Sequence, residues 1–187
     1  MKRYILFAGV NGSGKSTLYQ TRHEISDMSR INTDEILREF GSWKNKDDIM
    51  KAGKLAVMRF EEYIKQGISF NQETTLCGNA IFRMIERAKD QGYRIELHYV
   101  SVESVEVAKE RIAMRVLKGG HGIPDKDVER RYLKSIENLN KVIPMCDLTS
   151  IYDNTNQLRR IAIYKGSEIV RESKTLPNWY INGVKDK

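Results

Sequence analysis

The chain has 187 residues, of which 40% are hydrophobic and 30% charged, and its formal net charge is +7. This length and composition predict one domain, residues 1–187, of a soluble cytoplasmic protein, and no apolar run approaches the roughly 20 residues of a membrane span. Two cysteines, Cys77 and Cys146, are too few for a disulfide framework or a cysteine metal cluster. The basic residues are spread along the chain, which favours an anionic, phosphorylated ligand over nucleic acid.

The first expected strand, residues 3–9, leads into a glycine-rich stretch at residues 9–17 that fits the P-loop pattern G-x-x-x-x-G-K-[ST]. A helix is expected to follow at residues 16–25. Glycines let several backbone N–H groups converge on a phosphate at a helix N-terminus. Lys15 is predicted to reach the β- and γ-phosphates of ATP, and Ser16 to ligate Mg²⁺. The predicted nucleotide-binding residues here are Gly9, Asn11, Gly12, Ser13, Gly14, Lys15, Ser16 and Thr17.

Strands and helices alternate along the rest of the chain. Further strands are expected at residues 30–32, 68–73, 93–102 and 148–153. Helices are expected at residues 35–40, 47–66, 78–90, 103–117 and 125–143. A C-terminal extension, about 159–187, contains a predicted β-hairpin of residues 160–164 and 168–172, and the segment around Trp179 has no regular signal. The pattern predicts an α/β P-loop kinase fold with a largely parallel central sheet flanked by helices.

Ligands of an open parallel sheet bind beyond the carboxyl ends of its strands, so the polar residues that follow each strand are candidates. Asp34, after the second strand, is the predicted general base, because transfer to an alcohol benefits from a carboxylate that accepts the hydroxyl proton. A competing interpretation is that Thr33 or Asp34 caps the helix at residues 35–40.

Two later strands add further candidates. Glu73, at the end of the third strand, is predicted to hold a substrate hydroxyl or to act on Mg²⁺ through water. Thr75 is a candidate for substrate binding, with an ordinary strand-end threonine as the alternative. Asn154, after the fifth strand, is predicted to lie beside the adenine.

Residues 111–131 have the pattern of a lid, two helices joined by a flexible glycine-containing loop. Arginines on both helices are predicted to stabilise the charge of the transferring phosphoryl group; for each of them a solvated helix face is the alternative. The predicted catalytic arginines are Arg115, Arg130 and Arg131, and Arg111 and His121 are predicted to bind substrate. An exposed loop histidine without a role is the alternative for His121.

With these residues in view, the chain resembles the zeta-toxin family of P-loop kinases, in particular its compact "predicted ATPase" branch. The matching segments are residues 9–17, 32–34, 73–76, 119–124 and 130–131. The toxins phosphorylate UDP-N-acetylglucosamine or related nucleotide sugars, using ATP and Mg²⁺, and work beside a small antitoxin. The resemblance implies that Lys15 binds phosphate, that Asp34 is the catalytic aspartate, and that Glu73 and Thr75 bind the sugar. Cys77 and His121 stand where the toxins carry arginines.

The sequence therefore predicts an ATP-dependent phosphotransferase that acts on a hydroxyl of a small metabolite, with a nucleotide sugar as one candidate and an antitoxin as a candidate partner. Two alternatives stay open. One is a polynucleotide 5′-kinase, suggested by the positive charge, although base-stacking aromatics in a basic groove are not evident. The other is a nucleotide-dependent switch or binding module, which would have no need of an acceptor base.

Overall fold

The computed structural model describes residues 1–185. The strands of this part are β1 (Arg3–Gly9), β2 (Ser29–Asn32), β3 (Phe70–Thr74), β4 (Arg94–Ser101), β5 (Leu148–Asp153), β6 (Arg159–Lys165) and β7 (Glu168–Glu172). The α-helices are α1 (Lys15–Gln20), α2 (Thr33–Phe40), α3 (Lys46–Gln66), α4 (Ala80–Asp90), α5 (Val105–Leu117), α6 (Asp125–Val142) and α7 (Asn178–Tyr180). Short helical turns are η1 (His23–Ile25), η2 (Ile143–Met145) and η3 (Ile181–Lys185).

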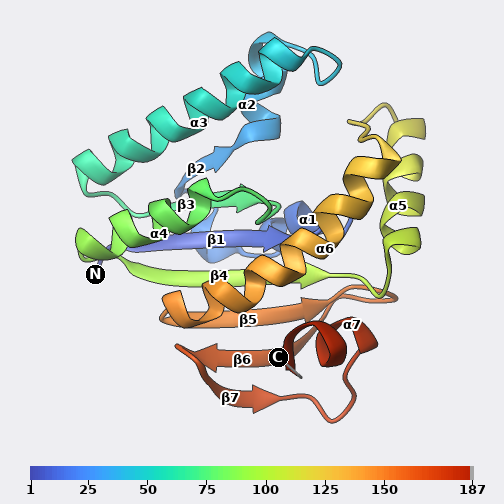
Figure 1. Cartoon of the computed structure of the whole chain (residues 1–187). Coiled ribbons are helices and arrows are strands. Elements are labelled where there is room, and N and C mark those ends of the chain that lie inside the picture. The colour runs from blue at the N-terminus through green and yellow to red at the C-terminus, as the bar shows by residue number, and fades with distance from the viewer. Residues whose placement is uncertain (186–187) are drawn as a thin grey trace.

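The strands form one sheet in the order β2-β3-β1-β4-β5-β6-β7 (Figure 1). Strands β1 to β5 are parallel to one another, whereas β6 and β7 form an antiparallel hairpin at the β5 edge. The predicted α/β P-loop fold, with its largely parallel sheet and C-terminal hairpin, is therefore confirmed. Because β1 is the middle one of the five parallel strands, the loop that follows it opens at the centre of their carboxyl edge.

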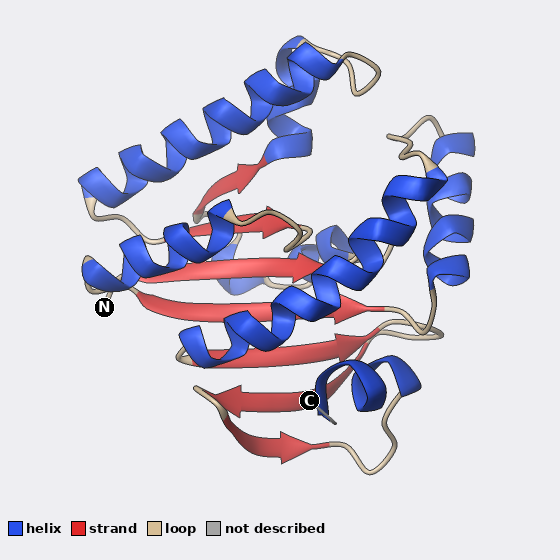
Figure 2. Ribbon diagram, viewed as in Figure 1, coloured by secondary structure: helices blue, strands red, loops and turns tan. Residues whose placement is uncertain are grey.

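Helices cover both faces of the sheet (Figure 2). The side chains of β1 alternate between two cores, as expected for a strand buried on both faces. Tyr4 and Leu6 pack with α3, α4 and α6 on one face, whereas Ile5 and Phe7 pack with Leu18 of α1 on the other. None of the described helices is long and apolar enough to cross a bilayer.

Two local predictions were wrong. The helix expected at residues 16–25 ends at Gln20, and η1 forms a separate turn after it. The segment around Trp179, expected to be irregular, forms α7 and η3, which pack on the core through Trp179, Tyr180 and Val184. These few helical residues depend on tertiary burial, because a helix this short is unstable by itself.

Candidate functional site

The loop between β1 and α1 is a tight backbone turn that two glycines make possible. Gly9 has φ +140°, and a Cβ added to it would lie 1.9 Å from the Val100 carbonyl oxygen of β4. Gly12 has φ +76°, and its Cβ would lie 2.7 Å from the Ala108 carbonyl oxygen of α5. Neither position admits a side chain, so the sequence pattern here reflects both backbone conformation and close packing.

Lys15 begins α1 and is buried, with 8% of its surface exposed. Its Nζ donates a hydrogen bond to the Val10 carbonyl oxygen at 3.1 Å, so the amine lies over the loop itself. Burial lowers the pKa of the Lys15 ammonium, while the nearby carboxylates of Glu73 and Asp34 raise it. Arg115 lowers it further, which places that guanidinium within electrostatic range of the loop.

Several buried polar atoms around this loop lack a hydrogen-bond partner among the described residues. They are Nε and Nη2 of Arg115, the Ser13 hydroxyl and Oδ1 of Asn11. A buried guanidinium without a counter-charge is unfavourable, and its donors match the oxygens of a phosphate. The Asn11 amide can also present donors if its oxygen and nitrogen exchange places. These residues therefore fit a bound phosphate chain.

Glu73 connects β3 to α1 and β2. Its carboxylate accepts hydrogen bonds from Ser16 Oγ, at 3.1 and 3.0 Å, and from Asn32 Nδ2, at 3.2 Å. Arg30 forms an ion pair with it at 2.8 Å, and the Arg30 guanidinium lies 3.7 Å from the centre of the Tyr19 ring. The Glu73 carboxylate is thus held beside the hydroxyl predicted to ligate Mg²⁺.

The structure shows that Asp34 does not cap helix α2. Helix α2 is capped by Asn32, whose Oδ1 accepts from the backbone N–H groups of Asp34 and Glu35 at 2.9 and 3.4 Å. The Asp34 side chain takes no part in capping and is 56% exposed. Its Oδ1 lies 4.0 Å from Nδ1 of His121, in the loop between α5 and α6.

His121 joins this loop to the segment between α2 and α3. Its imidazole stacks on Trp43, with 5.2 Å between ring centres and 24° between ring planes. Burial lowers the pKa of His121, and the Asp34 carboxylate opposes that change. Three arginines also lower this pKa and so lie within electrostatic range: Arg115, Arg131 and Arg38.

The predicted lid residues differ in what they contact. Arg111 donates from Nη2 to the Thr155 carbonyl oxygen at 2.9 Å, so it joins α5 to the loop after β5. Arg130 pairs with Asp127 at 3.0 Å and its side chain is 63% exposed, so the structure does not bring it to the P-loop. Arg115 and Arg131 are the two predicted catalytic arginines that the structure brings near His121.

The remaining predicted residues lie at the same edge of the sheet. Thr75 is half-buried directly after β3, in a turn where Leu76 has φ +61° and its carbonyl accepts from Asn138 at 2.7 Å. Asn154 follows β5 and donates from Nδ2 to the Ser13 carbonyl oxygen at 2.7 Å. Asn154 therefore supports the P-loop backbone directly.

Sequence reasoning missed Arg30 and Trp43. A signal for Arg30 exists: polar residues recur at alternate positions in two paired strands, Arg30 and Asn32 opposite Asn71 and Glu73. Such alternation in buried strands indicates a polar network on one face. Trp43 lies in a connecting segment, and no pattern in the sequence points to its contact with His121.

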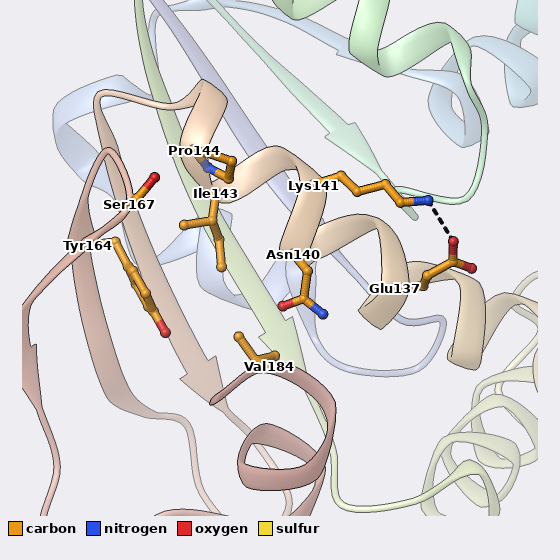
Figure 3. Close-up of a pocket in the computed structure, with 8 residues that line it drawn as sticks. All are labelled: Glu137, Asn140, Lys141, Ile143, Pro144, Tyr164, Ser167 and Val184. Carbon is orange, nitrogen blue, oxygen red and sulfur yellow. Dashed lines mark hydrogen bonds and ion pairs between the residues drawn. The ribbon is translucent and has the colours of Figure 1, made fainter. Parts of the chain in front are cut away.

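A pocket of about 500 Å³ lies away from this site (Figure 3). It is formed by the end of α6, the turn η2 and the β6–β7 hairpin, with Ile143, Pro144 and Tyr164 in its wall. Since η2 precedes β5, the pocket is at the amino edge of the sheet, opposite the P-loop. No P-loop residue lines it.

Solved structures with this fold include two protein complexes. The chain is 16% identical to a chain of the AvrRxo1-ORF1:ORF2 complex crystallised with ATP, with a TM-score of 0.69, and the match covers 90% of this chain and 60% of that one. It is also 16% identical to a chain of the PezAT chromosomal toxin–antitoxin system of Streptococcus pneumoniae, with a TM-score of 0.62 and coverage of 100% and 78%. At this identity the likeness shows the fold alone.

Similarity at the level of sequence identifies the family of this chain as well as its fold. An uncharacterized protein of Haemophilus influenzae is 36% identical over 128 residues, which is 68% of this chain and 91% of that protein. Residues 5–139, which include the P-loop, both candidate carboxylates and the arginines of the predicted lid, match the family described as "AAA domain". This chain therefore belongs to the AAA-domain family of P-loop proteins.

Proposed function

We propose that this protein is an ATP-dependent phosphotransferase that moves the γ-phosphate of ATP to a hydroxyl group of a small molecule. The observation that carries the proposal is the carboxylate of Asp34. Asn32 caps α2, so the Asp34 carboxylate takes no part in capping, and it lies within electrostatic range of Lys15. A nucleotide switch has no use for such a carboxylate, whereas transfer to an alcohol does.

The P-loop backbone, Lys15 and Arg115 are the groups that would hold the phosphate chain of ATP. Ser16 and the neighbouring Glu73 would hold Mg²⁺, and when bound that ion neutralises phosphate charge. Arg30 fixes the Glu73 carboxylate through its 2.8 Å ion pair, so the carboxylate does not need to reorganise when the ligand binds.

In the transfer step, Asp34 accepts the proton of the acceptor hydroxyl as the oxygen attacks the γ-phosphorus and the bond to the β-phosphate oxygen breaks. Lys15 and Arg115 face the charge that develops on the phosphoryl oxygens, and Arg131 lies within range on α6. Positioning and charge stabilisation supply most of the rate in such reactions. Arg130 would contribute only after its side chain leaves Asp127, with which it now pairs on the same helix.

The acceptor we propose is a small hydroxyl-bearing metabolite, with nucleotide sugars first in order of test. Support comes from the resemblance of residues 73–76 and 119–124 to the zeta-toxin pattern and from the fold shared with the PezAT chain. Thr75, His121 and Arg111 would complete the acceptor site. An antitoxin-like protein partner belongs to the same proposal.

Label transfer from γ-labelled ATP tests this function. The purified protein is incubated with Mg²⁺ and, separately, nucleotide sugars, amino sugars and 5′-hydroxyl oligonucleotides. Transfer is expected to a small acceptor, to disappear in Lys15→Ala, and to disappear in Asp34→Ala while ATP still binds. Asp90→Asn, an exposed carboxylate at the end of α4, is the matched control. Label on the oligonucleotide alone would instead identify a polynucleotide kinase.

A further inference from the structure

Residues 153–155, which are the last residue of β5 and the two residues after it, connect the P-loop to the predicted lid. The backbone N–H of Asn154 donates a hydrogen bond to the Ser101 carbonyl oxygen at 2.9 Å. The side-chain amide of Asn154 donates another to the Ser13 carbonyl oxygen at 2.7 Å. The Thr155 hydroxyl accepts from the backbone N–H of Glu103 at 2.9 Å, and its carbonyl accepts from Arg111. A shift of residues 153–155 would therefore reach both the P-loop and α5.

These residues are held from outside the sheet by the C-terminal segment. The Trp179 indole Nε1 donates to Oδ1 of Asp153 at 3.1 Å, and the Thr155 hydroxyl donates to the same oxygen at 2.7 Å. Asp153 and Trp179 are both buried, at 5% and 6% exposure, so water does not compete for this bond. Figure 1 shows α7 next to the carboxyl end of β5.

Trp179 lies well beyond residues 5–139, the part that matches the AAA-domain family. The segment thus lies outside the part that matches the family, yet three hydrogen bonds connect its indole to Arg111 of α5. The path runs from Trp179 to Asp153, from Asp153 to Thr155, and from the Thr155 carbonyl to Arg111. Asn154 extends the same loop to the P-loop.

We propose that Trp179 is a positioning residue for the nucleotide site: by fixing Asp153 it sets residues 153–155 in the place from which they hold the P-loop and α5. The inference rests on the proposed binding of ATP but not on the identity of any acceptor. The C-terminal segment then tunes nucleotide affinity without touching the nucleotide.

Isothermal titration calorimetry of the full chain with ATP and Mg²⁺ tests the inference. Trp179→Phe removes the N–H donor and keeps an aromatic ring in the core. The dissociation constant for ATP is expected to rise about two- to fivefold, because the indole acts on the site only through Asp153 and part of the effect of one lost hydrogen bond is spent on the fold. The matched control is Tyr180→Phe, which loses a hydroxyl bonded to Tyr164 and Glu172 in the same segment, away from residues 153–155. This control should bind ATP as the unaltered protein does.

A double-mutant cycle with Asn154→Ala separates positioning from general destabilisation. If Trp179 acts through residues 153–155, the two substitutions disturb the same loop, and their combined loss of ATP affinity should be smaller than the sum of the two single losses. Additive losses, equal losses in Trp179→Phe and Tyr180→Phe, or unchanged affinity in a folded Trp179→Phe would each overturn the inference. Absence of ATP binding by the unaltered protein would overturn the proposed function as well.

Discussion

The hydroxyl of Ser16 and the carboxylate of Glu73, 57 positions apart in the sequence, form hydrogen bonds of 3.1 and 3.0 Å. They join the first turn of α1 to the end of β3. Arg30 balances the charge of Glu73, and the Arg30 side chain is only 12% exposed. The side chain predicted to ligate Mg²⁺ is therefore already paired with a carboxylate that has a fixed orientation.

Replacing Glu73 by Gln should reduce phosphoryl transfer about 10- to 100-fold and raise the Mg²⁺ concentration needed for half-maximal rate, because groups that orient a metal ligand have effects of this size. A Mg²⁺ titration of the initial rate measures both. Glu35→Gln is the control, since Glu35 also pairs with Arg30 but is 46% exposed and does not contact Ser16. Equal Mg²⁺ dependence in both variants would remove Glu73 from the metal site.

Arg115→Met should change stability and activity in opposite directions. The guanidinium atoms Nε and Nη2 are buried without partners among the described residues, so their removal should stabilise the nucleotide-free protein by about 1–3 kcal/mol. Transfer should fall by about 10³-fold, because the charge of the transferring group loses a cation. Urea unfolding without nucleotide and the transfer assay measure the two effects.

Arg83→Met, at an exposed position on α4, controls for the loss of a surface arginine. It should leave unfolding within about 0.5 kcal/mol of the unaltered protein. An Arg115→Met protein that is both less stable and fully active would mean that this arginine serves the fold rather than a phosphate.

The P-loop and the meeting of polar residues at one sheet edge could be predicted from the sequence, because both follow from local rules. The glycine spacing encodes the turn, and parallel strands must end at the same edge. Ser16 and Asn32 both donate hydrogen bonds to Glu73, so residues that follow different strands do meet as this reasoning expects. The identity of the cap of α2 was missed because Asn32, Thr33 and Asp34 are all residue types that cap helices.

Side-chain direction on the lid could not be predicted in the same way. Arg111 and Arg115 are four residues apart on α5, yet one contacts Thr155 and the other has no hydrogen-bond partner among the described residues. Arg130 and Arg131 are adjacent, so a helix points them about 100° apart, and only the packing of α6 decides which of them lies near His121. The hydrogen bond from Trp179 to Asp153 joins residues 26 positions apart, and no local pattern in the sequence predicts this contact.

Acid should destabilise the protein through His98. Burial lowers its pKa to about 4, and Arg22 contributes to this, while the imidazole stacks on Phe7. The unfolded chain binds the proton near pH 6.5 and the folded protein only near 4, so stability is lost as the pH falls through this window. Between pH 7 and pH 5 the loss from this one group is about 2 kcal/mol.

Urea unfolding at the two pH values measures this loss. His98→Phe should show a smaller pH dependence by about that amount, whereas His23→Gln, at an exposed position, should behave as the unaltered protein does. An identical pH dependence in His98→Phe and the unaltered protein would assign the acid sensitivity to other groups.

Two glycines with positive φ should respond very differently to alanine. At Gly92, with φ +74°, an added Cβ meets nothing within 4 Å, so the substitution costs about 1–2 kcal/mol of backbone strain. At Gly9 an added Cβ would lie 1.9 Å from the Val100 carbonyl oxygen. Because Gly9 and Val100 are partners in the β1–β4 pairing, this steric clash is relieved only if the two strands move apart. Thermal unfolding should show a fall in Tm of about 2–8 °C for Gly92→Ala and a much larger fall, or no folded protein, for Gly9→Ala. Equal shifts would mean that the start of the P-loop is not packed against β4 as described, and the phosphate site would then lack the support that Gly9 provides.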